Sequence, residues 1–258
     1  MERLKALLFP PKCASCAKLL DFEKVGRYEA LCRDCLSSFR DEQKEICLFC
    51  GQRVSDCTCV TELIQKAGCE RLLKMVYYRH GRGDCVQNRM IFRIKNKRDL
   101  RTTRFFAKEL AEEIRVCAKN GVFSLQDAVV TYIPRRRRAV LERGTDQAKA
   151  LAVAIAKELD LQAAPCLVRS RAGQKEQKTL SPKERLRNAR ASFSVKHDAL
   201  ILNRTVLLVD DIVTTGASLA AATRKLLHAG AGCVICVAAS SDDCNRAPLS
   251  PNSIKTEK

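Results

Sequence analysis

The stretch VLLVDDIVTTGAS, at residues 206–218, carries the strongest structural signal in this chain. It begins as an apolar run of strand length, continues with two consecutive acids and ends in small and hydroxyl residues around a glycine. A helix is expected next, over residues 216–228. The free backbone N–H groups and the positive dipole end at a helix start suit a phosphate dianion. The stretch therefore predicts a phosphate-binding loop formed by Thr214, Thr215, Gly216, Ala217 and Ser218.

Two neighbouring acids, Asp210 and Asp211, distinguish this loop from other phosphate-binding loops. Carboxylates repel free phosphate but accept hydrogen bonds from hydroxyls, so the pattern suits a sugar that carries a terminal phosphate. A Walker loop would need a lysine after its last glycine, and none follows Gly216. The alternative is an ordinary strand end at which an Asp or Thr caps the next helix. The sequence favours a sugar phosphate, with Asp210 and Asp211 as the catalytic residues that hold the ribose hydroxyls.

Helical and strand patterns alternate through the rest of the chain after about residue 100. Strand, helix and strand joined by short connections give right-handed parallel crossovers. The expected fold class is therefore α/β, with a parallel sheet flanked by helices. We expect helices at 104–119, 147–159 and 216–228, and strands at 128–133, 164–168, 205–209 and 233–238.

Cysteine spacing sets the N-terminal segment apart. Cys-x-x-Cys pairs, separated by a spacing typical of tetrahedral thiolate cages, predict a structural Zn²⁺ site, and a second site is expected nearby. The last ligand of the second site is open, because Cys69 is an alternative to the tight Cys57-x-Cys59 pair. Four thiolates leave no open position for a substrate, so these zinc ions should stabilise the fold rather than catalyse. The expected ligands are Cys13, Cys16, Cys32 and Cys35, and Cys47, Cys50, Cys57 and Cys59.

Charge and hydropathy limit the partners and the compartment. A formal charge of +18 makes polyanions natural partners, with a solvated cationic surface as the plain alternative. No stretch approaches the ~18 apolar residues that a membrane helix needs, so no membrane insertion is expected. The first residues are too charged for a secretory signal, and clustered thiols favour zinc in a reducing compartment. We expect a cytoplasmic protein.

These motifs together resemble those of a known family. The loop at 206–218 is similar to the signature of type I phosphoribosyltransferases, and the chain from about residue 10 to 239 resembles the ComF family. Members join an N-terminal double zinc ribbon to a phosphoribosyltransferase domain. Further similar blocks lie at 143–147, where the family commonly reads Arg-Gly-Phe-Asn-Gln, and at 177–188. The resemblance implies a double zinc ribbon at 10–62, a phosphoribosyltransferase-like domain at 70–242 and a loose C-terminal tail at 243–258.

Two basic segments acquire a meaning from this resemblance. Arg135 and Arg136 open a run of arginines that follows the expected strand at 128–133, where such enzymes bind pyrophosphate. The segment at 169–190 resembles the mobile loop that closes over the active site in this fold. A solvated charge run or a contact to nucleic-acid phosphates is the alternative for both. The histidines have no partnered spacing and are assigned no role.

Two function classes follow. The first is an enzyme that transfers a phosphoribosyl group from phosphoribosyl diphosphate, with Mg²⁺, to an acceptor that the sequence does not identify. The second is a non-catalytic binding protein for single-stranded DNA. The resemblance implies an association with DNA uptake and natural transformation beside a partner helicase, with the phosphate loop used only for ligand binding. The sequence favours a phosphoribosyltransferase-like competence protein.

Overall fold

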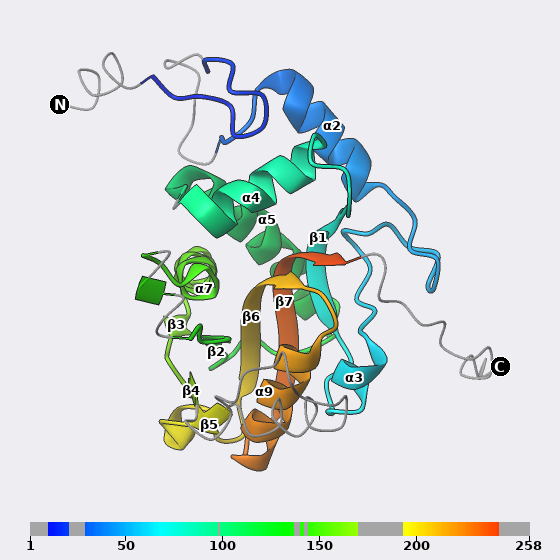
Figure 1. Ribbon diagram of the computed structural model, residues 1–258. Coiled ribbons are helices and arrows are strands. Elements are labelled where there is room, and N and C mark those ends of the chain that lie inside the picture. Colours follow the sequence, from blue (N-terminus) through cyan, green and yellow to red (C-terminus); the bar gives the residue numbers. More distant parts are fainter. Residues whose placement is uncertain are drawn as a thin grey trace, which may run out of the picture.

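The computed structural model describes residues 10–20, 29–97, 99–136, 140–141, 144–169 and 193–242. Its centre is a five-stranded parallel sheet in the order β1-β7-β6-β2-β3 (Figure 1). The expected parallel sheet flanked by helices is confirmed. Its strands are β1 (Leu72–Tyr78), β2 (Val129–Tyr132), β3 (Gln162–Ala163), β6 (Thr205–Val213) and β7 (Cys233–Asp242).

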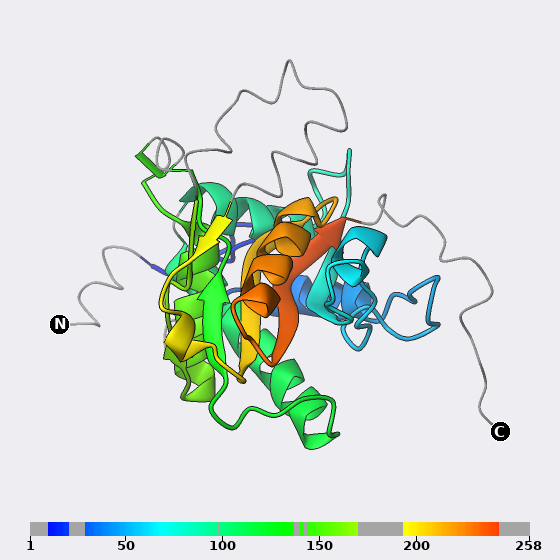
Figure 2. The ribbon, with the colours of Figure 1, turned by 90° about the horizontal axis from the view of Figure 1, so that it is seen from below.

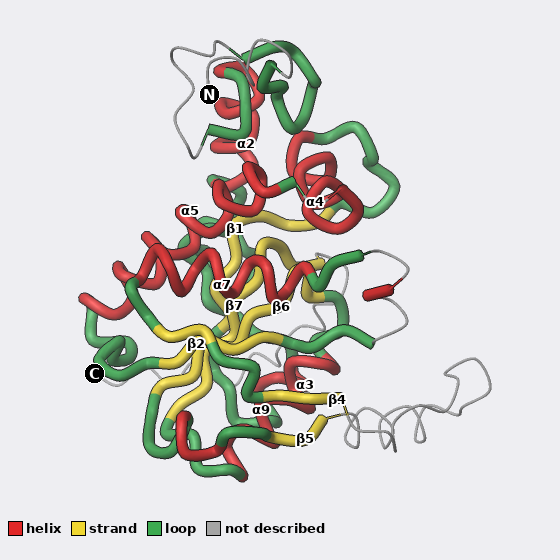
Figure 3. Tube along the Cα trace, turned by 90° about the vertical axis from the view of Figure 1, so that its left-hand side faces the viewer, coloured by secondary structure: helices red, strands yellow, loops and turns green. Residues whose placement is uncertain are grey.

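Two hydrophobic cores cover the two faces of this sheet, as a parallel sheet requires. One face is covered by α5 (Leu100–Lys119) and α7 (Gln147–Leu159), with α2 (Arg33–Gln43) and α4 (Val86–Lys97) further out. The other face is covered by α3 (Glu62–Gln65) and α9 (Ala217–His228). Figure 2 and Figure 3 show the same layers from below and from the side.

Local sequence explains the two helices on the first face. Asp99 caps α5, because its carboxylate accepts hydrogen bonds from the backbone N–H groups of Arg101 and Thr102, both at 3.1 Å. Asp146 caps α7 in the same way, through Lys149 N at 3.2 Å. The predicted span of α7 is confirmed, whereas α5 begins four residues earlier than the predicted residue 104.

The predicted strand at 164–168 is confirmed only at its end, as β4 (Leu167–Arg169). Strand β4 pairs antiparallel with β5 (Phe193–Val195) in a separate two-stranded sheet, and residues 164–166 form no strand between β3 and β4. Pro165 lies between them, and a proline has no N–H to donate to a sheet ladder. A short 3-10 helix at Asp198–Leu200 then leads to β6.

The long strands extend beyond their apolar runs. Strand β6 continues through Asp210 and Asp211 to Val213, and β7 continues to Asp242, because their backbones stay paired in parallel register as far as Val213 and Ser241. Strand β1, which pairs with β7, and helices α2, α3 and α4 were not predicted from the sequence. Among the described residues, no helix has both the length and the apolar character needed to cross a bilayer.

The N-terminal segment packs on the helical layer over the first face. Phe39 of α2 is fully buried and makes edge-to-face contacts with Phe105 and Phe106 of α5, at centroid distances of 5.3 and 5.8 Å. Arg40 of α2 also forms an ion pair with Glu109 of α5. The segment that carries the clustered cysteines is therefore attached to the sheet layer through an aromatic core.

Candidate functional site

The strand order places one crevice at the carboxyl edge of the sheet. From β2 the chain crosses outward to β3, and from β6 it crosses in the opposite direction to β7. The strand order thus reverses between β2 and β6, and open α/β sheets bind ligands outside the strand ends at such a switch point. The residues that follow β2 and those at the end of β6 meet here.

Asp211 and Arg135 join these two strand ends. Arg135 Nη2 donates to Asp211 Oδ2 at 2.6 Å, and the side chains are only 17% and 14% exposed. Backbone N–H groups also hold both acids, because Asp211 N donates to Asp210 Oδ1 at 2.9 Å and Ile212 N donates to Asp211 Oδ1 at 3.0 Å. The acid pair is therefore oriented before any ligand binds.

Electrostatics at this edge raise the pKa of Asp210. Burial raises the pKa of Asp210 well above its ordinary value of 3.8, and the negative charge of Asp211 raises it further. The guanidinium of Arg135 opposes both effects. A carboxyl group with a raised pKa in a crevice is typical of functional sites.

The predicted phosphate loop is open to solvent. Thr214, Thr215 and Ser218 are exposed, and Ala217 is half-buried. Gly216 stands at the N-cap of α9 with a φ of +73°, a conformation that side-chain-bearing residues rarely adopt. The turn thus presents hydroxyls at a helix start, the arrangement expected of an anion-binding loop.

Helix α3, which is far away in sequence, packs against this loop. A Cβ on Gly216 would lie 2.5 Å from Thr61 Oγ1 and 2.8 Å from Ile64 Cδ1. Ile64 of α3 is fully buried in the same core as Leu219 and Ala220 of α9. The glycine is therefore required both by its backbone conformation and by the closeness of α3, and no sequence motif indicated this contact.

Three arginines surround the crevice. Arg135 also donates from its backbone N to Asp146 Oδ2 at 3.0 Å, which links the end of β2 to the cap of α7. Arg136 is exposed. Arg169 was expected only as the first residue of the basic loop. In the structure it lies beside the end of β2, where its Nε donates to the Pro134 carbonyl at 2.7 Å. The remaining basic residues of these segments, at 137–138 and 170–190, lie outside the described residues.

Arg169 has the environment of a site residue. Its guanidinium stacks over the ring of Phe193 at 5.0 Å from the centroid. Burial lowers the pKa of Arg169, and the positive charge of Arg136 lowers it further, against the acids Asp210 and Asp146. Arg135 and Arg169 thus both interact with the acid pair, Arg135 through a hydrogen bond to Asp211 and Arg169 through its charge with Asp210.

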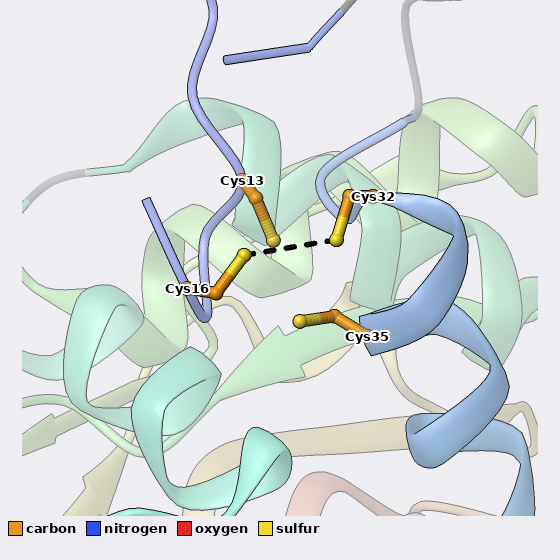
Figure 4. A group of neighbouring side chains, drawn as sticks. All are labelled: Cys13, Cys16, Cys32 and Cys35. Atoms are coloured by element: carbon orange, nitrogen blue, oxygen red, sulfur yellow. Dashed lines mark hydrogen bonds between the residues drawn. The ribbon is translucent and has the colours of Figure 1, made fainter. Parts of the chain in front are cut away.

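The eight predicted zinc ligands form two separate clusters. In each, the four sulfur atoms lie within 4.8 Å of one another. Figure 4 shows Cys13, Cys16, Cys32 and Cys35 pointing toward a common centre, with Cys16 Sγ and Cys32 Sγ 3.7 Å apart. Four thiolates at ~2.3 Å from a zinc ion in tetrahedral geometry stand about 3.8 Å apart, so the donor set fits structural Zn²⁺.

The second cluster consists of Cys47, Cys50, Cys57 and Cys59. The alternative ligand Cys69 is excluded from it, because Cys69 Sγ lies 3.5 Å from Cys236 Sγ and 3.2 Å from the carbonyl of Arg71. Lys74 of β1, only 1% exposed, donates to the carbonyl of Cys57 at 2.9 Å and contacts its sulfur at 3.3 Å. This cluster is thus tied directly to the central sheet.

One family model matches part of this chain. Residues 146–252 match the family model described as "Phosphoribosyl transferase domain". With the parallel sheet and the two cysteine clusters, this defines a type I phosphoribosyltransferase-like fold behind an N-terminal module consistent with zinc ribbons. No curated protein matches the chain.

Solved structures of three proteins are similar to parts of this chain. A hypoxanthine phosphoribosyltransferase from Staphylococcus aureus is 15% identical, with 57% of this chain and 67% of that chain covered and a TM-score of 0.36. A protein from Thermus thermophilus is 20% identical over 56% of this chain and 85% of its own, with a TM-score of 0.34. An allosteric regulatory enzyme of purine biosynthesis is 18% identical over 53% of this chain, with a TM-score of 0.34. This chain spans only 25% of that last enzyme.

Proposed function

We propose that this protein binds phosphoribosyl diphosphate and transfers its phosphoribosyl group to an acceptor, with release of pyrophosphate. One observation carries the proposal: the open hydroxyl loop at the start of α9, the acid pair of β6 and Arg135 meet at the switch point of the sheet. The family match to a phosphoribosyl transferase domain covers the loop and the acids.

Each group has a task in this reaction. The loop from Thr214 to Ser218 holds the 5-phosphate through its hydroxyls and the backbone N–H groups at the helix start. Asp210 and Asp211 accept hydrogen bonds from the ribose hydroxyls and favour positive charge that develops on the sugar ring. Arg135, with Arg136, stabilises the departing pyrophosphate, which leaves with the electron pair of the broken C–O bond.

Oxygen donors at this edge fit Mg²⁺, which usually binds one or two carboxylates together with substrate phosphates. Asp210 and Asp211 are the residues that would hold it. Bound there with the diphosphate, the ion would neutralise charge on the leaving group.

Calorimetry with phosphoribosyl diphosphate and Mg²⁺ tests the proposal without knowledge of the acceptor. We expect saturable binding that falls at least about 10-fold in Asp210→Asn/Asp211→Asn, since a lost hydrogen bond to a charged group is worth about 1.5–3 kcal/mol. Asp127→Asn is the matched control, because Asp127 is exposed and lies at the opposite edge of the sheet, before β2. Equal binding by the double variant and the control would contradict the proposal.

A second candidate function is single-stranded DNA binding in natural transformation, as the resemblance to the ComF family implies. The charge of +18 and the two four-cysteine clusters ahead of the transferase-like domain favour it. None of the described cysteines forms a disulfide, in keeping with a reducing compartment. DNA affinity should fall steeply with salt and survive the double Asp variant; salt-insensitive or absent binding would remove this candidate.

A further inference from the structure

His80 and Asp242 form a hydrogen-bonded pair at the carboxyl edge of the sheet. His80 follows β1 and Asp242 ends β7, and His80 Nε2 lies 2.6 Å from Asp242 Oδ2. The Asp242 side chain is 6% exposed, whereas that of His80 is 54% exposed. The ring of Tyr78 meets the imidazole edge-on at 5.2 Å. The imidazole of His80 is thus held in place and open to solvent, and the carboxylate of Asp242 lies buried behind it.

The turn that carries His80 is held rigidly. Asn88 of α4 accepts from Arg79 N at 3.0 Å and donates to the carbonyls of Arg79 and Arg82, at 2.5 and 2.7 Å. Asn88 is itself 5% exposed. The Arg79 guanidinium forms an ion pair with Glu45, which follows α2. Both α4 and the cysteine-rich segment therefore fix the position of this histidine.

Strand order sets this pair opposite Arg135. Strand β6 has β2 on one side and β7, then β1, on the other (Figure 1). Asp242 pairs with Tyr78 and lies four residues beyond Ala238, the partner of Asp210, or about 13 Å along the strand at ~3.3 Å per residue. The pair therefore stands beyond the acids at the same carboxyl edge, level with the end of β6, where Val213 pairs with Ser241.

We infer that His80 is the general base that activates the acceptor, a claim that rests on the proposed function. Displacement at the anomeric carbon brings the nucleophile to the face opposite the leaving group. With pyrophosphate held by Arg135 on the β2 side, the acceptor enters from the β7 and β1 side, where His80 stands. The acceptor class is an N–H or O–H nucleophile, because only such a group has a proton to give to the imidazole.

The proposed step moves one proton and two electron pairs. The acceptor bonds to the anomeric carbon as its proton passes to His80 Nδ1, and the C–O electron pair leaves with pyrophosphate. Asp242 keeps the Nε2–H toward itself and so directs the basic Nδ1 to the acceptor. His80 is the catalytic residue and Asp242 is a positioning residue.

Pyrophosphate release from Mg²⁺–phosphoribosyl diphosphate, with water as the probe acceptor, tests this role on the zinc-loaded full chain. We expect His80→Gln to lower kcat by about 100-fold or more, the usual contribution of a general base. Its Kd for Mg²⁺–phosphoribosyl diphosphate should stay within about twofold, because the imidazole does not hold this ligand. Added imidazole should restore turnover in His80→Ala, and Asp242→Asn should lower kcat without raising KM. His228→Gln, on α9, is the matched control.

The outcomes separate this inference from the proposed function. Wild-type protein that fails to bind Mg²⁺–phosphoribosyl diphosphate overturns both. Wild-type protein that binds it but releases no pyrophosphate to water overturns the inference alone. The inference alone is also overturned if the His80 variants keep wild-type turnover. The same holds if added imidazole does not restore turnover in His80→Ala. Unchanged melting temperature and zinc content in the variants show that a loss of turnover is not a loss of fold.

Discussion

The hydroxyl of Thr61 donates to the carbonyl oxygen of Thr215 at 3.4 Å, which joins the N-terminal segment to the candidate phosphate loop. Thr61 stands at the N-cap of α3, yet its hydroxyl makes no cap hydrogen bond there. It lies two residues after Cys59, a member of the second cysteine cluster. The segment of the second cysteine cluster and the candidate phosphate loop are thus in direct contact, although 154 residues separate them in sequence.

The contact between Thr61 and Gly216 makes the glycine irreplaceable. We expect Gly216→Ala to lower the free energy of unfolding by about 2–4 kcal/mol, since overpacking adds to the strain of a positive φ. In a Thr61→Ala background the loss should be smaller by about 0.5–1.5 kcal/mol, because one of the close contacts is gone. Urea unfolding of the four proteins measures this coupling.

Gly121→Ala is the control for backbone strain alone. Gly121 has a φ of +72°, close to that of Gly216, but a Cβ there meets nothing within 4 Å. Its replacement should lower the free energy of unfolding by only about 1–2 kcal/mol. Equal losses at the two glycines, or no coupling to Thr61, would show that α3 does not constrain the loop.

Loss of the second metal site should loosen the phosphate loop. Cys59→Ser removes a ligand next to Thr61, so we expect faster amide hydrogen exchange at residues 61–65 and 214–218 and the loss of about one zinc ion per chain. Cys16→Ser removes a ligand of the first cluster, which packs toward α4 and α5 instead, and should leave residues 214–218 unchanged. Identical exchange at the loop in both variants would contradict this coupling.

Asp211 competes with pyrophosphate for Arg135. Because the two side chains already form a hydrogen-bonded ion pair, Asp211→Asn should release the guanidinium and raise the affinity for inorganic pyrophosphate by about 3- to 10-fold. The same variant should bind phosphoribosyl diphosphate more weakly, since it loses a carboxylate for the ribose. Calorimetry with both ligands decides this, and a weakening of both would refute the competition. Arg135→Ala should weaken both.

Asp210 should reduce the stability of the free protein at neutral pH. Its raised pKa means that folding disfavours the ionised carboxylate, so its contribution is most favourable below 3.8 and is lost as pH rises through the folded pKa. We expect Asp210→Asn to raise the melting temperature at pH 8 by about 2–4 °C, the shift for ~1 kcal/mol in a chain of this size. The gain should shrink as pH falls toward 5. A gain that does not depend on pH would exclude this cause.

Much of the fold was predictable because its signals are local. The apolar run of β6, the small residues after it and the helix pattern of α9 lie within one stretch. The alanine-rich stretch at 147–159 likewise indicated α7. Cys-x-x-Cys spacing predicted the first cluster, since two thiolates on one turn already face a common metal. In the second cluster, the structure decided between Cys59 and Cys69 as the last ligand. Pro165 was a local signal against a strand, and the strand predicted at 164–168 begins only after it, at Leu167.

The support around the site could not be predicted in this way. Thr61, Arg169 and the pair of His80 with Asp242 carry no motif, and each gains its place only from contacts across the fold. Strand β1 has an ordinary apolar sequence, so its parallel pairing with β7, which brings Tyr78 beside Asp242, had no sequence signal.

The sequence by itself determined an α/β chain with a phosphate-type loop, an acid pair and two thiolate clusters, because turn chemistry and side-chain periodicity act over a few residues. Tertiary structure alone decided that Arg135 pairs with Asp211, that α3 supports Gly216 and that His80 faces the same sheet edge. Parallel strands far apart in sequence end at one edge, and only their order and register decide which side chains meet there.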